Sequence, residues 1–126
     1  MKINLRKIIE TSIDAKTKML NVNLEAIDNA CKLMLGSVNG GNKILWCGNG
    51  GSAADSQHMS AELMGGLRSH TRDPIPSIAL STDSSFLTAW SNDTSFDDIF
   101  SRQIEGIGLP GDILVAISTS GNSTNV

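Results

Sequence analysis

Residues 44–67 read as a buried strand, a glycine-rich loop and a helix in direct succession, and this order limits the fold more than any other stretch. The apolar run 43–47 is short, as expected for a strand that is covered on both faces. Two similar runs follow, at 78–80 and 113–117. Segments with helical spacing lie between them. Strands that alternate with helices predict a parallel, doubly wound α/β sheet in three layers.

The helical segments that we expect between the strands are 53–66, a short one at 85–90, and 96–107. The last of these places six residues on one face: Phe96, Ile99, Phe100, Gln103, Ile104 and Ile107.

Two amphipathic helices are predicted before the first strand, over residues 4–21 and 24–38, with a glycine stop at Gly40 and Gly41. We expect a single domain, with these helices in residues 1–40 and the sheet in residues 41–126. Two helices before the first strand carry more apolar surface than a compact βαβ unit can use to cover its sheet. The apolar stripe either packs against another subunit or covers one face of the sheet.

Composition narrows the class of protein. Of 126 residues, 40% are hydrophobic and 18% are charged, and the formal net charge is -3. Lys and Arg are scattered, so nucleic acid is not expected as a partner. There is no long apolar run and no signal-peptide pattern, so we expect a cytoplasmic protein that does not bind membranes. Cys31 and Cys47 lack the spacing of a metal or redox motif and are predicted to be free, mostly buried thiols.

The stretch 118–126 follows a strand and resembles the loop and first residues of another helix. We therefore expect that the chain continues beyond Val126 in a longer protein.

A glycine loop, residues 48–52, follows the first strand. Ser52 and Asp55 have the spacing of a capping box at the start of the helix, and the glycines allow a ligand to approach the backbone. The loop is a candidate site for an anion or a polyol. An ordinary turn between strand and helix is the alternative.

A serine loop, residues 118–123, follows the third strand and carries Ser118, Thr119, Ser120 and Ser123. Ligands of open α/β sheets gather beyond the carboxyl ends of the strands, so this loop and the glycine loop are expected to line one crevice. Hydroxyl and backbone N–H groups can hold a phosphate without Lys or Arg. A solvent-exposed helix cap is the alternative.

His58 and Glu62 are four residues apart, and therefore lie on one face of the predicted helix. They can ligate a metal together or act on one substrate. A surface hydrogen bond is the alternative, because zinc needs about three or four ligands. His70 is expected to face solvent in a polar loop. Asn92 and Asp93 read as a turn and cap before a helix.

Four separated motifs resemble the phosphoheptose isomerases, which consist of a sugar-isomerase (SIS) domain: CGNGGSAADSQHMSAEL, ALSTD, SNDTSFDDIFSRQIEGIG and GDILVAISTSGNSTNV. The resemblance runs through nearly the whole chain. It implies conversion of sedoheptulose 7-phosphate to D-glycero-D-manno-heptose 7-phosphate, the first step towards the heptose of lipopolysaccharide. It also implies a homotetramer with active sites between subunits.

The resemblance assigns roles to individual residues. Glu62 matches the catalytic base, and His58 and Glu62 match two zinc ligands. The family takes its remaining ligands, a Gln and a His, from a later helix that this sequence does not contain. The positions that match substrate contacts are Asn49, Gly50, Gly51, Ser52, Glu62, Asn92, Asp93, Ser118, Thr119, Ser120 and Ser123.

Isomerisation of a ketose to an aldose moves a proton between C1 and C2 through an enediol, which requires a base of this kind. The alternative function is a non-catalytic SIS-domain protein that resembles the replication-initiator-associating protein. The SIDAKTKM stretch favours it, whereas Glu62 and the unbroken serine loop favour the enzyme.

Overall fold

A computed structural model describes residues 4–66 and 68–126 of the chain. Residues 1–3 of the predicted region 1–40, and Leu67 at the end of the stretch 44–67, lie outside the described residues. The elements are α1 (Leu5–Val22), α2 (Leu24–Asn39), β1 (Ile44–Gly48), α3 (Gly51–Gly65), β2 (Ser77–Ala79), α4 (Ser84–Asp93), the 3-10 helix η1 (Phe96–Asp98), α5 (Ser101–Ile107) and β3 (Ile113–Ile117). They form two compact units that divide between Leu33 and Met34.

Both predicted leading helices are present. Asn4 caps α1, because its side chain accepts a hydrogen bond from the Lys7 amide at 3.1 Å. Gly41 has a φ of 80°, a value that favours glycine, in the turn after α2. No residue of α1 is buried within its unit. The prediction of a buried thiol is wrong for Cys31, which is exposed, and right for Cys47.

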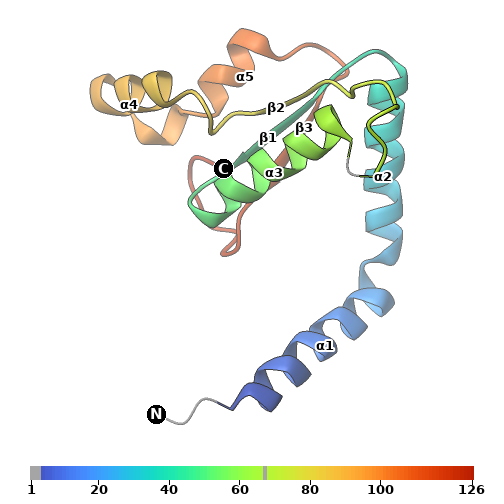
Figure 1. The fold of residues 1–126 in the computed structure, drawn as a ribbon. Helices are drawn as coiled ribbons and strands as arrows, with labels where there is room; N and C mark the ends of the chain where they lie inside the picture. The colour runs from blue at the N-terminus through green and yellow to red at the C-terminus, as the bar shows by residue number, and fades with distance from the viewer. Residues whose placement is uncertain (1–3, 67) are drawn as a thin grey trace. The chain divides into compact units, whose positions relative to one another are not determined.

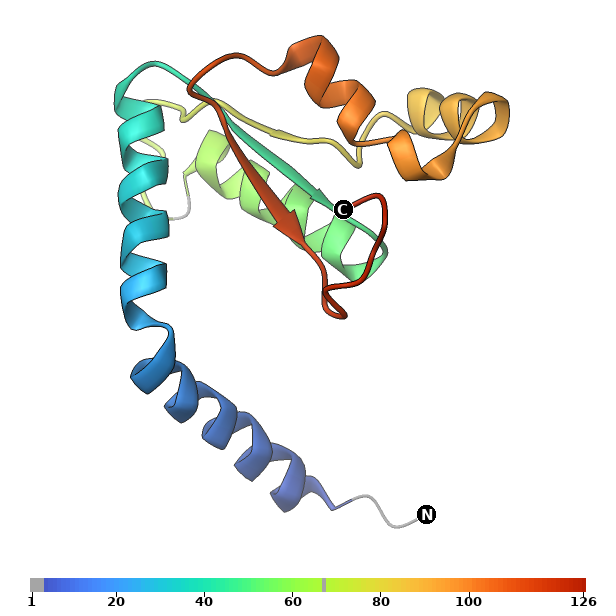
Figure 2. The same cartoon turned by 180° about the vertical axis from the view of Figure 1, so that it is seen from behind.

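The sheet is parallel, with the strand order β2-β1-β3, which confirms the predicted α/β class. All five residues of the central strand β1 are buried. Figures 1 and 2 show α3 across one face of this sheet. Ser52, Ser56 and Ser60 are the buried residues of α3, and their small side chains let the helix lie close to the strands.

The opposite face of β1 carries the main apolar core. Leu45 and Cys47 are 2% and 1% exposed and cluster with Leu80, Ile99 and Phe100. Burial raises the pKa of the Cys47 thiol, which keeps it protonated and unreactive. Within the described residues, none of the helices combines the length and hydropathy that crossing a membrane requires.

The prediction of one continuous helix over residues 96–107 is wrong in two respects. The segment is divided into η1 and α5, and Phe96 and Ile107 are exposed. Ile99 and Phe100, which the prediction placed on the same face, are buried, and they lie between the two helices. The Gln103 side chain, also predicted on that face, donates to the carbonyl oxygens of Leu80 and Ile99 at 2.9 and 2.8 Å.

The third strand is at its predicted position but is not buried. Its residues alternate between intermediate and exposed, and Leu114 is 43% exposed. Within the described residues β3 pairs with β1 on one side only. An edge strand of this length leaves its outer side uncovered, which the apolar run 113–117 could not indicate.

A polar clamp joins the starts of β1 and β3. Asp112 accepts hydrogen bonds from the Lys43 ammonium at 2.5 Å, the Lys43 amide at 3.0 Å and the Leu109 amide at 2.7 Å. The two side chains of the ion pair are only 17% and 7% exposed. The hydrogen bonds from Lys43 lower the pKa of Asp112 from 3.8 to about 2.

The clamp predicts a specific acid sensitivity. Because the folded-state pKa of Asp112 is depressed, the clamp stabilises the fold fully above about pH 3.8, and this contribution is lost as the pH falls towards 2. Asp112→Asn is expected to lower the melting temperature at neutral pH. The melting temperature of this variant should also fall less than that of the unmutated protein when the pH is lowered. Thermal unfolding across this pH range checks the result. Asp28→Asn is the control, since Asp28 forms an ion pair with Lys32 that is mostly exposed. Equal melting curves for both variants would contradict a stabilising clamp.

Candidate functional site

The glycine loop turns immediately after β1. A Cβ atom on Gly48 would lie 2.8 Å from the Ser52 carbonyl oxygen and 2.9 Å from that of Ile117, so only glycine fits between α3 and β3. Gly50 has a φ of 55° and is the N-cap of α3. The chain therefore enters the helix at Gly51, within a few residues of the strand.

The predicted capping box is wrong. Ser52 lies inside α3 and is 7% exposed, and the N-cap Gly50 has no side chain to bond the first turn. The positive φ of Gly50 starts the helix before Ser52 is reached, which moves the Ser52 side chain to the buried face. A helix start without a capping side chain leaves its positive dipole end open to an anion.

The serine loop is folded on its own hydrogen bonds. The hydroxyls of Ser118 and Ser123 are 3.1 Å apart, the Gly121 amide donates to Ser118 Oγ at 3.1 Å, and the Asn122 amide donates to Ser120 Oγ at 3.2 Å. Thr119 and Ser120 are exposed. The loop thus gathers hydroxyl groups in a fixed arrangement.

The glycine loop is in contact with Asn125, in the segment that follows the serine loop. Asn49 Nδ2 donates to Asn125 Oδ1 at 2.7 Å, and Asn125 Nδ2 donates back to Asn49 Oδ1 at 3.0 Å. In both overall views the C-terminal end of the chain lies beside the loop after β1 (Figures 1 and 2). Asn125 was not among the predicted site residues, because a single Asn two positions after the serine loop carries no signal of its own.

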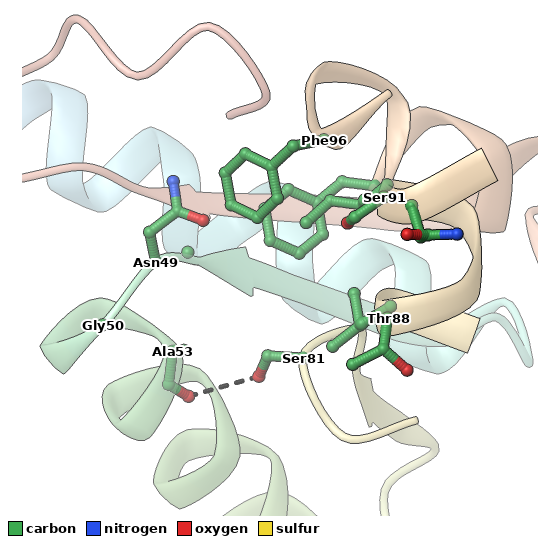
Figure 3. Close-up of a pocket in the computed structure, with 12 residues that line it drawn as sticks. Asn49, Gly50, Ala53, Ser81, Thr88, Ser91 and Phe96 are labelled. Atoms are coloured by element: carbon green, nitrogen blue, oxygen red, sulfur yellow. Dashed lines mark hydrogen bonds between the residues drawn. The ribbon is translucent and has the colours of Figure 1, made fainter. Parts of the chain in front are cut away.

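A cleft of about 620 Å³ opens beside the glycine loop. Three of the predicted substrate contacts line it: Asn49, Gly50 and Asn92. The prediction that the serine loop lines the same crevice is wrong for this cleft, because in the described chain none of residues 118–123 is part of its lining. Figure 3 shows the cleft between the glycine loop and α3 on one side and α4 and η1 on the other. The other lining residues are Gly48, Ala53, Ser81, Leu87, Thr88, Ser91, Phe96, Ile99 and Phe100.

Sequence reasoning missed the contribution of α4 and of the loop after β2. Ser81 follows the end of β2, and its hydroxyl donates to the Ala53 carbonyl oxygen at 3.4 Å (Figure 3). A polar residue just past a parallel strand is a signal that could have identified it. Thr88 and Ser91 lie three residues apart on α4, and only the packing of that helix turns them towards the cleft.

The interpretation of Asn92 and Asp93 as a turn before a helix is wrong. Both lie in the last turn of α4, which Asp83 caps at its start. The Asn92 amide donates to the Asp93 carboxylate at 2.7 Å. Because α4 runs three residues past the predicted end at 90, Asn92 is carried to the wall of the cleft.

His58 and Glu62 share one face of α3 as predicted. His58 Nε2 lies 3.3 Å from Glu62 Oε1, and the side chains are 66% and 30% exposed. His70 is exposed, and its Nδ1 lies 3.1 Å from the Gly65 carbonyl oxygen. In the described part of the chain, the cleft lining includes neither His58 nor Glu62.

The described residues alone do not make a zinc site. Within residues 4–66 and 68–126, no group of three or more His, Cys, Asp or Glu side chains is placed to hold a metal ion. His58 and Glu62 are two donors, and zinc needs about three or four.

Arg72 secures the end of α3 that carries Glu62. Its guanidinium donates to the carbonyl oxygens of Glu62 at 2.7 Å and Leu63 at 2.6 Å. A cation at a helix C-terminus satisfies carbonyl groups that the helix leaves open. The backbone that bears Glu62 is therefore held by a residue outside the helix.

The chain is similar to known proteins over its full length. It is 53% identical over 126 residues to phosphoheptose isomerases from Shewanella sp. (strain ANA-3) and Shewanella baltica (strain OS155 / ATCC BAA-1091), and it spans 61% of their length. The structure of a phosphoheptose isomerase from Neisseria gonorrhoeae matches with a TM-score of 0.87 and 45% identity. That of a phosphoheptose isomerase from Francisella tularensis matches with a TM-score of 0.90 and 38% identity.

Each structural match covers 96% of this chain, and 62% and 63% of the two solved chains respectively. The family model of the SIS domain matches residues 9–126. The glycine loop, the serine loop and the parallel sheet all lie within this range. The chain therefore belongs to the SIS-domain family.

Proposed function

We propose that the protein is an isomerase that converts sedoheptulose 7-phosphate to D-glycero-D-manno-heptose 7-phosphate. The observation that carries the proposal is the direct contact between the glycine loop and the segment that follows the serine loop, beside a cleft of about 620 Å³. A sugar phosphate needs an anion site near a cleft that offers hydrogen-bonding side chains, and Asn49, Thr88 and Asn92 are among the residues that line this cleft. The similarity to phosphoheptose isomerases supports the same substrate.

The serine loop is the proposed phosphate site. Its hydroxyls are close together, and Ser120 is exposed to an incoming ligand. Neutral donors can hold a phosphate when backbone and helix-end dipoles add to them. Asn49, Gly50, Gly51 and Ser52 of the glycine loop, with Asn92 and Asp93 of α4, are the proposed contacts of the sugar.

Glu62 is the proposed base. A carboxylate would remove a proton from C1 of the ketose and return it to C2, while the proton of the C1 hydroxyl is transferred to the oxygen on C2, so that C1 becomes the aldehyde. Glu62 is 30% exposed on its side chain and is held through its backbone by Arg72. In the described chain Glu62 does not line the cleft of the glycine loop, so its proposed role rests on the similarity to phosphoheptose isomerases.

Zinc enters the proposal only through His58 and Glu62, as two of its ligands. The other ligands would have to come from residues outside the described part of the chain. No step of the proton transfer is assigned to the metal, because the described residues do not complete its site.

The proposal is tested by incubating the full-length protein with sedoheptulose 7-phosphate and following the aldose product. Formation of D-glycero-D-manno-heptose 7-phosphate supports it, and the product would then serve lipopolysaccharide heptose synthesis. Absence of product from a protein that binds the substrate would favour the non-catalytic alternative. The cytoplasmic location predicted from composition stays a prediction.

Ser120→Ala is expected to weaken binding of sedoheptulose 7-phosphate by about 0.5 to 1.5 kcal/mol, because one neutral hydrogen bond to the phosphate is lost. Calorimetry measures the change. Binding of unphosphorylated sedoheptulose is the control, and it should not change. Equal affinity of the unmutated protein for the phosphorylated and unphosphorylated sugars would contradict a phosphate site.

A homo-oligomer, in the form of a homotetramer, is also part of the proposal. The first unit carries many exposed apolar side chains: Leu5, Ile8, Ile9, Ile13, Met19, Leu20, Val22, Leu24, Ile27 and Leu33. Exposed apolar surface on this scale is typical of an interface.

Paired replacement of Leu24 and Ile27 by serine is expected to reduce the oligomer to smaller species. Light scattering of the full-length protein measures the mass. Replacement of Lys16 and Lys18, which lie on the polar part of the same unit, serves as the control. A monomeric unmutated protein would contradict the proposal.

A further inference from the structure

The side chains of Asn49 and Asn125 form a closed pair between two segments that are far apart in sequence. Each amide donates one hydrogen bond to the other and accepts one from it, at 2.7 and 3.0 Å. Each retains one N–H group and one lone pair for another partner. Rotation of either amide by half a turn would place N–H against N–H and oxygen against oxygen. The pair therefore fixes the relative orientation of both amides.

The two members of the pair have different surroundings. Asn49 lines the cleft, whereas Asn125 is 9% exposed and is not among the residues of the described chain that line it. Val126, next to Asn125, packs against the apolar cluster of Leu45 and Phe100. The Val126 amide donates to the Ser123 carbonyl oxygen at 3.1 Å, which connects this anchor to the serine loop.

These contacts form a continuous path from the serine loop to the cleft. The serine loop is tied to the segment 125–126, that segment is anchored in the core, and Asn125 holds the side chain of Asn49. Buried polar groups that satisfy each other are costly to separate, because each partner left alone loses its hydrogen bonds without regaining water.

We propose that Asn125 is a positioning residue that orients the Asn49 amide in the cleft and sets its distance from the serine loop. The inference rests on the proposed function, because a sugar that is bound by its phosphate at the serine loop would then meet Asn49 in one orientation. Misplacement of a bound substrate by about 1 Å can cost a large part of the rate. Inorganic phosphate bound at the serine loop alone is expected not to depend on the pair.

The test compares the full-length protein with Asn49→Ala, Asn125→Ala and the double variant. Thr124→Ala is the matched control, because Thr124 is the exposed neighbour of Asn125. For each protein we would measure kcat and KM for sedoheptulose 7-phosphate, and calorimetric binding of the sugar phosphate and of inorganic phosphate. The melting temperature records any loss of stability.

Asn125→Ala is expected to lower kcat and to weaken sugar-phosphate binding on the order of tenfold, since both hydrogen bonds of the pair are lost. Inorganic phosphate should bind as in the unmutated protein. The double variant should be no worse than Asn49→Ala alone, because Asn125 acts through Asn49. Thr124→Ala should behave as the unmutated protein.

Independent, additive effects of the two single variants would overturn the inference, as would unchanged kcat and sugar binding in Asn125→Ala. Equal weakening of sugar phosphate and inorganic phosphate would also overturn it, since that result would mean a general collapse of the serine loop. Failure of the proposed function has a different signature, in which the unmutated protein binds sedoheptulose 7-phosphate without turnover. The binding measurements then still decide the role of Asn125.

Discussion

Glu62→Gln is expected to lower kcat for sedoheptulose 7-phosphate by on the order of 10²-fold or more, because glutamine keeps the shape of the side chain but cannot accept the proton. The affinity for the substrate should change much less. Steady-state kinetics of the full-length protein measure both quantities. Near-normal turnover would show that another group is the base.

The loss of activity should not reflect unfolding. The Glu62 carboxylate is 3.3 Å from His58, whose side chain is 66% exposed, and exposed ion pairs contribute at most about 1 kcal/mol to stability. The melting temperature of Glu62→Gln should therefore stay close to that of the unmutated protein. Glu105→Gln is the control for removal of a carboxylate, since Glu105 lies on α5 and pairs with Arg102 at the surface. It should leave turnover unchanged.

Gly48→Ala is expected to destabilise the fold by about 3 kcal/mol or more, since the added methyl group has no space. The new Cβ would lie 2.8 Å from the Ser52 Cβ and 2.9 Å from the Ile117 carbonyl oxygen, and backbone atoms cannot move aside as a flexible side chain can. Denaturant unfolding measures the change in the free energy of unfolding. Because α3, β1 and β3 meet here, the glycine loop and the serine loop should be displaced together.

Gly106→Ala is the matched control for this variant. Gly106 lies in α5, and a Cβ atom there would have no heavy atom within 4 Å. Alanine at such a helical position is expected to be neutral or to stabilise by up to about 1 kcal/mol. A similar loss of stability in both variants would show that the tight approach at Gly48 has no special role.

The secondary structure and the class of fold follow from local patterns in the sequence. The helix periods in residues 5–39 and the apolar run that forms β1 predict elements to within one or two residues of their observed bounds. Parallel pairing follows as well, since strands separated by helices have few other ways to pack. The pattern also places the glycine loop and the serine loop at the same edge of the sheet, because the carboxyl ends of neighbouring parallel strands meet there.

Local sequence patterns give wrong predictions where contacts with residues distant in sequence determine helix bounds or burial. Ser52 has the spacing of a helix cap, but the positive φ of Gly50 starts the helix earlier and buries the hydroxyl. Phe96 and Ile107 have the spacing of a buried face, but Gln103 bonds the backbone of Leu80 and Ile99 and the helix is interrupted. The run 113–117 is apolar enough to be buried, but in the described chain β3 has a strand on one side only.

The sequence by itself determined the order of elements, the parallel sheet and the two polar loops, because each of these depends on residues that are close together in the chain. Only the tertiary structure decided which side chains face the cleft and which hold them in place. Asn49 and Asn125 are 76 positions apart, and their pairing depends on the register of β1 against β3 and on the anchoring of Val126 in the core. A contact of this kind has no local signature, because its energy arises only when the two segments meet.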